Sequence, residues 1–357
     1  DAEPRYTIVA LAARRDGGAT LAQAGPVTDE IAWSALPNLR THWTYLELAK
    51  ASPGLEVPLI SDPRAAKLFH KMIANAQPFS EAVAGTRFRP WRPIDATLDR
   101  KSGLLKERGR GGRGWPVYGG RNFYLWEPEI DESEFVLDPK AGLDVLQRKR
   151  LRSDVWEGTP RNILDDPNTL PPNRCTVLFR DVARATDSRT VIACLVPPQR
   201  FAANQAPTLV QIGGSERDTA LRLAVMCSLP FDWSARRRVE QHLNFFILNA
   251  LPVPVAKLGN KLCERAIELA AKLACIDKRF ASFAKTCGVP VGALNDTARE
   301  NAIAEIDAIV ALMYGLTFDD LETIFADFTT DAVPLSRRAA VRQHFERLAK
   351  INHEKSA

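Results

Sequence analysis

The sequence lacks most of the short motifs that mark a complete catalytic site. It has no GxxxxGK[ST] nucleotide-binding loop and no GxSxG nucleophile turn, and its five histidines lack the spacing of metal ligands. Acidic pairs such as Asp319 and Asp320 are expected at this content of charged residues, and they favour a solvated surface over a metal-dependent nuclease site. The sequence therefore indicates no catalytic residue and no metal site in this chain.

Long apolar runs and paired cysteines are also missing. No apolar segment approaches the roughly 18 residues that a membrane helix needs, and the first residues lack the apolar core of a secretion signal. The six cysteines form no CxxC pair, so we interpret them as buried free thiols in a reducing compartment. We expect a cytoplasmic protein with no membrane partner. The start at Asp1 rather than methionine suggests a piece of a longer protein.

Positive charge is concentrated in one segment. The formal net charge is +5, but residues 87–121 hold ten Arg or Lys residues against three acidic ones, a local balance of +7. The rest of the chain therefore sums to about −2. A local cationic patch is the surface that a protein presents to a phosphate backbone, so this distribution favours a nucleic-acid partner.

Hydrophobic periodicity predicts an α+β fold, with a mixed α/β body followed by a helical C-terminal bundle. The predicted strands cover residues 6–13, 122–126, 135–137, 176–183, 190–197 and 208–212. The predicted helices cover residues 62–76, 217–228, 262–285 and 298–315, and one more begins at the capping pair Thr317 and Asp320. We expect three parts: an N-terminal α/β segment (1–85), a recognition domain (86–255) and a helical domain (256–357).

The most unusual stretch is GRGGRGWPVYGGRNFYLW, residues 109–126, which is rich in glycine, arginine and aromatic residues. No strand-to-helix glycine fingerprint surrounds GRGGRG, which disfavours a dinucleotide cradle. Glycines allow close backbone approach, and the arginines and rings suit a nucleic acid, although a solvated loop tip is the alternative. The candidate DNA contacts in and beside this stretch are Arg108, Arg110, Arg113, Tyr118, Arg121 and Asn122.

Two further stretches carry candidate contacts. In FRDVARATDSRTVIACLVP, the donors Arg180, Arg184, Thr186 and Arg189 suit phosphate or guanine-edge contacts, but these arginines could equally pair with nearby aspartates to pin a loop between two strands. In SLPFDWSARRRVEQHLNFF, Arg236 and Arg237 lie beside apolar residues of the core and could face a DNA backbone. Because His242 precedes an apolar run, we expect it to satisfy buried backbone groups.

Read in order, four blocks resemble the C-terminal target-recognition region of large adenine-specific DNA methyltransferases. These enzymes include type IIG restriction-modification enzymes with a TaqI-like specificity domain and related methylases of phage-defence systems. The blocks are PNLRTHW with PLISDPRAAKLFHKM, then WPVYGGRNFYLW, then FRDVARATDSRTVIACLVP, then PFDWSARRRV with HLNFFILNALPVP. A helical tail containing AEIDAIVALMYGLT also fits, so the resemblance runs from about residue 37 to 317. One departure is RNFYLWEP, where relatives often have a longer acidic continuation.

The resemblance implies a module that recognises double-stranded DNA sequence-specifically in a bacterial, cytoplasmic restriction-modification or phage-defence enzyme. The (N/D)PP(Y/F) tetrapeptide and the glycine-rich S-adenosylmethionine motif of these methyltransferases do not occur here. We therefore expect no cofactor in this chain, and a methyltransferase domain, in the parent polypeptide or in trans, that binds S-adenosylmethionine. Two alternatives remain open: a metal-dependent nuclease, and a protein-interaction scaffold that docks a methyltransferase.

Overall fold

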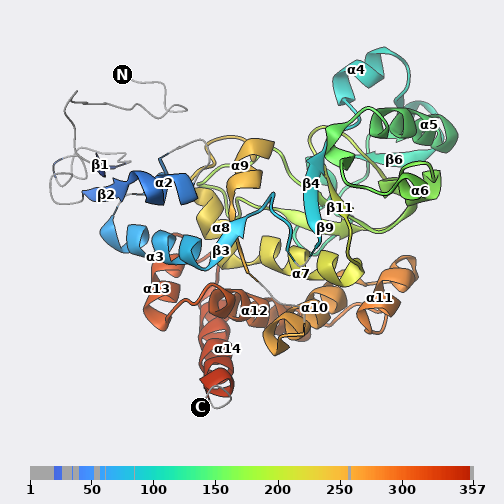
Figure 1. The fold of residues 1–357 in the computed structure, drawn as a ribbon. Helices are drawn as coiled ribbons and strands as arrows, with labels where there is room; N and C mark the ends of the chain where they lie inside the picture. The colour runs from blue at the N-terminus through green and yellow to red at the C-terminus, as the bar shows by residue number, and fades with distance from the viewer. Residues whose placement is uncertain are drawn as a thin grey trace, which may run out of the picture.

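The computed structural model describes residues 20–25, 34, 40–51, 57–60, 62–83, 85–255 and 259–353 (Figure 1). The strand predicted at 6–13 and part of the PNLRTHW block lie outside these residues. The described chain is a mixed α/β structure whose C-terminal helices pack together, which confirms the predicted fold class.

Two four-stranded sheets form the body. The central sheet has the order β4(Arg87–Trp91)-β11(Thr208–Ile212)-β8(Thr176–Phe179)-β9(Ala193–Val196), and every pairing in it is antiparallel. The second sheet has the order β10(Phe201–Ala202)-β6(Trp115–Tyr118)-β7(Phe135–Leu137)-β5(Lys106–Glu107). Two small ladders pair β1(Thr20–Gln23) with β2(Thr41–Thr44) and β12(Pro252–Pro254) with β3(Ala76–Pro78).

The described helices fall into two groups along the chain. The first group is α2(Tyr45–Ala51), α3(Pro63–Ala74), α4(Ala96–Lys101), α5(Pro139–Arg150), α6(Arg161–Leu164), α7(Glu216–Cys227), α8(Leu229–Arg236) and α9(Phe245–Ala250). The C-terminal group is α10(Lys261–Ala274), α11(Ala281–Cys287), α12(Asp296–Met313), α13(Phe318–Ala326) and α14(Leu335–His353). Helix α7 lies between the central sheet and the C-terminal group, with β9 on one side and α10 and α11 on the other (Figure 1).

Local sequence signals set several helix ends as predicted. The Asp62 side chain accepts hydrogen bonds from the backbone N–H groups of Arg64 and Ala65, and α3 begins at Pro63. At α13, Thr317 and Asp320 form the reciprocal capping box that the TFDD pattern predicts. Gly315 has φ of +69°, the left-handed conformation that ends α12.

Other predicted elements differ in the structure. Residues 122–126 form no strand, because the Asn122 side chain closes a 3₁₀ turn at Gly120–Asn122 and Trp126 adopts a positive φ of 63°. The helix predicted over 262–285 ends at Ala274, and the Asp277 side chain caps a new turn by accepting from the Arg279 N–H. The predicted helices did not include α2, α4, α5, α6, α8, α9 and α14.

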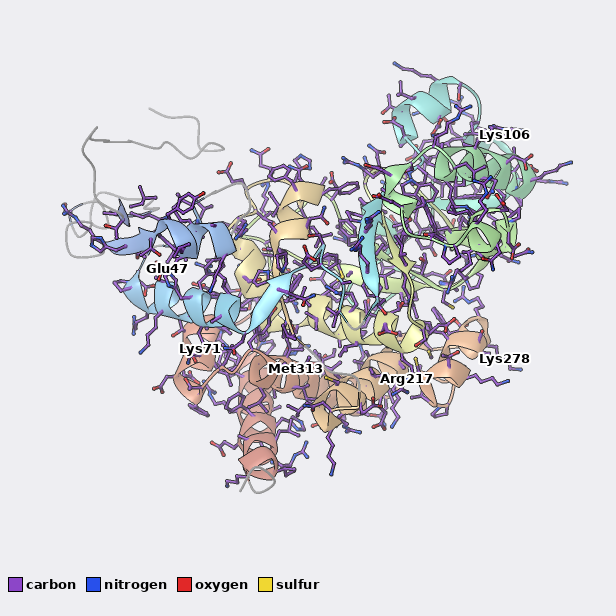
Figure 2. The ribbon with its side chains drawn as sticks, viewed as in Figure 1. Glu47, Lys71, Lys106, Arg217, Lys278 and Met313 are labelled. Atoms are coloured by element: carbon purple, nitrogen blue, oxygen red, sulfur yellow. The ribbon has the colours of Figure 1, made fainter. Side chains whose placement is uncertain are left out.

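One large apolar core joins the predicted parts. It runs from Trp43 to Leu348, so it crosses both boundaries that we predicted at 85/86 and 255/256. The Tyr314 hydroxyl of α12 donates to the Pro252 carbonyl at 2.6 Å in β12. Lys71 of α3, which is labelled in Figure 2, forms an ion pair with Asp320 of α13. A smaller core around Trp91, Trp156 and Phe201 joins residues of both four-stranded sheets with Leu146 of α5.

Two predicted absences can be compared with the described residues. All six cysteines are free thiols and five are buried, as predicted, and burial raises the pKa of Cys275 and Cys287 to about 12. No single helix in the described ranges has both the length and the apolar character to cross a membrane. Helices α12 and α13 reach these limits only as a pair that is bent by 119°.

The contact between α5 and Phe201 gives a stability prediction. A Cβ atom added at Gly142 would lie 2.3 Å from Cζ of the buried Phe201 ring, so Gly142→Ala should lower the free energy of unfolding by about 1–3 kcal/mol. This loss should occur although alanine favours a helix. Gly109→Ala is the control, because a Cβ there meets nothing within 4 Å and should change stability by less than about 1 kcal/mol. Urea unfolding of both variants measures the difference, and equal stabilities would contradict the close packing at Gly142.

Candidate nucleic-acid interface

The loop between β8 and β9 is held from below by a buried arginine. The Arg236 guanidinium is almost fully buried and donates to the carbonyl oxygens of Ala185 at 2.6 Å, Asp187 at 2.5 Å and Ser188 at 3.1 Å. Its Nε donates to Asp232 Oδ2 at 3.1 Å. A single guanidinium therefore fixes three carbonyl groups of the loop, which leaves the side chains of the loop free to face outward.

Asp232 fixes the far end of the same loop. Its Oδ1 accepts from the backbone N–H groups of Thr190 at 2.9 Å and Val191 at 2.6 Å, and it lies 3.4 Å from Nε of Arg189. Arg189 in turn donates from Nη2 to the carbonyls of Cys227 at 2.8 Å and Ser228 at 3.2 Å. The fully buried Asp232 carboxylate thus lies between two buried guanidinium groups, Arg189 and Arg236.

Three of the predicted DNA contacts therefore serve the interior in this structure. Arg237 is also buried: its Nε donates to the Trp233 carbonyl at 3.3 Å and its guanidinium pairs with Asp327. Burial lowers the pKa of Arg237, and the nearby Asp327 opposes this shift. Arg189, Arg236 and Arg237 are therefore not part of the candidate DNA interface, because their guanidinium groups bind buried carbonyl and carboxylate oxygens.

The outward side of the loop carries Arg184, Thr186 and Ser188, which are all exposed. The Arg184 backbone N–H donates to Asp187 Oδ2 at 3.0 Å, so this carboxylate closes the turn. Within the described chain, no ion pair involves the Arg184 side chain. This guanidinium is therefore available to an anionic partner.

Asp181 joins three segments at the edge of this loop. Its carboxylate lies 3.5 Å from Arg92 Nη1 and 3.2 Å from His242 Nδ1, and its carbonyl accepts from the Leu243 N–H at 2.7 Å. Val182 and His242 form an antiparallel β-bridge, and the Arg92 guanidinium lies 4.5 Å from the centre of the Phe245 ring. Exposed Arg92 and His242 thus lie beside the loop.

The sequence analysis did not predict that Arg92 and His242 lie at this surface. We expected His242 to satisfy buried groups, but its side chain is 47% exposed. Arg92 and His242 lie 89 and 61 residues from Asp181 along the chain, so no local spacing could have found them.

Arg180 connects the loop to the 119–124 turn. Its Nη2 donates to the Phe123 carbonyl at 2.5 Å, and its guanidinium lies 5.3 Å from the centre of the Tyr124 ring. Burial lowers the pKa of Arg180, opposed by the charges of Tyr124 and Asp187. A Cβ at Gly120 would lie 3.1 Å from the Gln205 carbonyl oxygen and 3.5 Å from Arg180 Cγ, so glycine allows this close approach. The Tyr124 hydroxyl lies 3.3 Å from Ser188 Oγ, which ties the turn to the loop.

The residues predicted in and beside the glycine-rich stretch divide into two sets. Tyr118 and Asn122 are buried. The Tyr118 hydroxyl lies between Glu129 and Arg200, and burial raises the pKa of Tyr118 to about 12. Asn122 Oδ1 accepts from the Gly119 N–H at 2.7 Å. The arginines of this stretch are exposed; Arg110 pairs with Glu107 at 2.8 Å, and Arg121 lies near Asp131 and Glu134. Arg108 and Arg113 have no ion pair among the described residues.

The cationic segment is also less positive in the fold than in the sequence. Residues 127–134 contribute five carboxylates directly after it, so residues 87–134 together carry ten basic and eight acidic side chains. Arg121 is paired with two of these carboxylates, and Arg100 with Glu107 at 2.5 Å. In the described ranges, the cations without such pairing include Arg108 and Arg113 beside β5 and Arg184 in the 180–188 loop.

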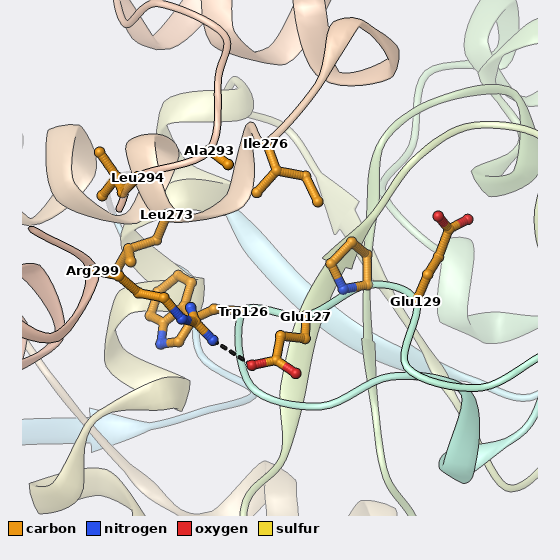
Figure 3. A pocket seen from close by; sticks show the side chains of 9 residues that line it. Trp126, Glu127, Glu129, Leu273, Ile276, Ala293, Leu294 and Arg299 are labelled. Carbon is orange, nitrogen blue, oxygen red and sulfur yellow. Dashed lines mark hydrogen bonds and ion pairs between the residues drawn. The ribbon is translucent and has the colours of Figure 1, made fainter. Parts of the chain in front are cut away.

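The acidic 127–129 segment is held by the C-terminal helices. Glu127 pairs with Arg299 at 2.6 Å across a pocket of about 270 Å³ that is also lined by Trp126 and Leu273 (Figure 3). Arg279 and Arg200 donate to Glu129, and the hydrogen bond from Arg279 is the main reason that its pKa falls to about 2. No group of three His, Cys, Asp or Glu side chains in the described ranges could hold a metal ion.

Comparisons with known proteins give partial similarities only. No protein-family model matches the chain, and no curated protein sequence matches it. Among solved structures, the chain is similar to the type IIL restriction-modification enzyme MmeI in complex with DNA, with a TM-score of 0.33 and 14% sequence identity over 70% of this chain. It is also similar to the type IIG restriction endonuclease BpuSI, with a TM-score of 0.35 and 14% identity over 77% of this chain. The matched part is 36% of each of these enzymes, so the chain spans about a third of their length.

The buried carboxyl group of Asp307 in α12 predicts that the stability of the fold depends on pH. It is buried, its Oδ1 accepts from the Leu229 N–H at 2.8 Å at the start of α8, and burial raises its pKa from 3.8 to about 6, opposed by Arg189. The folded protein therefore holds this proton more tightly than the unfolded chain. Stability should fall as pH rises from 3.8 to about 6, by up to about 3 kcal/mol.

Asp307→Asn keeps the acceptor for Leu229 and removes the titration. The unfolding free energy of the variant minus that of the natural chain should therefore become more positive as pH rises from 3.8 to about 6. Urea unfolding of both proteins at several pH values measures this difference. Parallel pH profiles of the two proteins would show that Asp307 does not titrate there.

Proposed function

We propose that this chain is a double-stranded DNA recognition module of an adenine-specific methyltransferase or restriction-modification enzyme, without the catalytic half. The observation that carries the proposal is the loop between β8 and β9. Arg236 and Asp232 fix its backbone from below, and it presents Arg184 and Thr186 outward. Recognition groups need such support, because a contact held by a rigid element keeps its geometry when DNA binds.

The exposed cations would supply contacts of two kinds. Arg184, with Arg108, Arg110 and Arg113 of the segment that connects β5 to β6, would hold phosphates, which set the register of a protein on a duplex. Thr186 and Arg180 would approach base edges. Arginine and threonine are donors that read bases in the major groove, and Arg180 is oriented by Phe123 and Tyr124. Arg121 would have to exchange its two carboxylate partners for phosphate, so we rank it below Arg184.

The catalytic chemistry would lie elsewhere. A methyltransferase domain, in the parent polypeptide or in trans, would bind S-adenosylmethionine and receive the adenine that is extruded from the duplex. The module itself would position the DNA, and such an enzyme acts on DNA in the bacterial cytoplasm. The four sequence blocks that resemble target-recognition regions support this assignment.

The salt dependence of binding tests the phosphate contacts. The slope of the logarithm of affinity against the logarithm of salt concentration should fall by ~0.9 for each phosphate that the chain neutralises. Arg184→Ala should lower affinity for duplexes of different sequence alike and make this slope less steep by about one unit, because a single phosphate contact is lost. Fluorescence anisotropy with labelled duplex DNA at several salt concentrations measures both quantities.

Arg64→Ala is the matched control. Its side chain is 90% exposed on α3, and its nearest carboxylate is its own helix cap, Asp62, at 4.0 Å. This variant should bind as the natural chain does. A flat salt response of the natural chain, or equal slopes for the Arg184 and Arg64 variants, would count against the proposed surface.

A further inference from the structure

An aromatic side chain is exposed beside the cationic loop. Phe246, in the first turn of α9, is 61% exposed. Its neighbour Phe245 is anchored, because its ring lies 4.5 Å from the Arg92 guanidinium and 6.4 Å from the centre of the buried Phe179 ring. The backbone at the start of α9 is therefore fixed, while the next ring along the helix lies in solvent.

A second apolar side chain flanks the same segment. Val182 is 57% exposed and forms the β-bridge with His242, two residues before the Asn244 that precedes α9. Around this segment lie the charged and titratable groups Arg92, His242 and Asp181, and the Asp181 carboxylate is shared by the other two. The outer face therefore combines exposed apolar groups with cationic ones.

This combination suits one kind of partner more than others. A regular duplex offers phosphates to Arg92 and Arg184, but it hides the faces of its bases within the stack. A strand whose bases have left the stack offers both phosphates and flat aromatic faces. Surfaces that bind such strands pair cationic side chains with rings on which bases stack.

We propose that Phe246 stacks on a base that has left the DNA stack, and that Arg92 and Arg184 hold the adjoining phosphates. This proposal rests on the proposed function, and it adds a preference for DNA with an opened base pair over perfectly paired DNA. Val182 would fill the space next to the opened step, as apolar wedges do in proteins that unstack DNA.

The experiment compares two DNA probes with the full chain. One is a perfect duplex, and the other is the same duplex with a short central stretch of unpaired bases. The natural chain should bind the second probe more tightly. Phe246→Ala should weaken binding to the second probe by about five- to 150-fold, corresponding to 1–3 kcal/mol for one stacked base, and should leave binding to the perfect duplex unchanged.

Two further variants make the result specific. Phe246→Trp should restore the preference, because it keeps a ring face. Phe318→Ala removes an aromatic side chain that is 37% exposed on α13, outside the proposed surface, and should bind both probes as the natural chain does. The thermal unfolding midpoint of each variant shows that the fold is retained, which we expect because both side chains are exposed.

The possible outcomes separate this inference from the proposed function. Equal affinity of the natural chain for the two probes, or an equal loss on both probes in Phe246→Ala, would overturn the stacking role while leaving DNA binding intact. A Phe246→Ala variant that binds both probes normally would also overturn it and would point to a protein partner for this ring. Failure of the natural chain to bind either probe would overturn the proposed function itself.

Discussion

The ionic contact on which the candidate surface depends is that of Asp232 with Arg189 and Arg236. A buried carboxylate between two buried guanidinium groups is tolerable only when further hydrogen bonds compensate the loss of water. Here backbone carbonyls accept from Arg189 and Arg236, and backbone N–H groups donate to Asp232. The contact connects α8 with the loop after β8 and with the start of β9. Removing one member would leave an unpaired charge in the core, a change that typically costs 3–5 kcal/mol. The conformation of the loop is thus part of the stability of the core.

The same contact explains why arginine content alone was a poor guide to the surface. The Arg189 and Arg236 side chains are buried. Arg184, in the loop between β8 and β9, is exposed and forms no ion pair in the described structure. After the glycine-rich stretch, Asp131 and Glu134 pair with Arg121, and the five carboxylates of residues 127–134 nearly balance the charge of residues 87–134. Under the proposed function, electrostatic attraction for DNA would be local, set by a few unpaired guanidinium groups rather than by the whole segment.

The features that the sequence predicted are those that neighbouring residues determine. The ends of α3 and α13 followed from Asp62, Thr317 and Asp320, and strand β11 was read directly from TLVQI, because caps and β-branched runs act within a few residues. The contacts of Arg236 could not be predicted in this way, since its carbonyl partners in the loop lie 48 to 51 residues away. A buried arginine and an exposed one look alike in sequence. Only the partner that the fold brings to each one distinguishes them.

The continuous core has a consequence for how such modules could be exchanged between proteins. Residues 86–255 were the unit that the sequence suggested, yet β12 pairs with β3, α7 packs between β9 and α10, and the Arg236 guanidinium also lies 3.4 Å from the carbonyl oxygen of Asp327, beyond α13. A hybrid protein joined at residues 85 and 255 would separate β12 from its native partner β3, α7 from α10, and Arg236 from Asp327. Under the proposed function, a change of specificity would therefore require the C-terminal helices as well, so the smallest transplantable unit would be larger than residues 86–255.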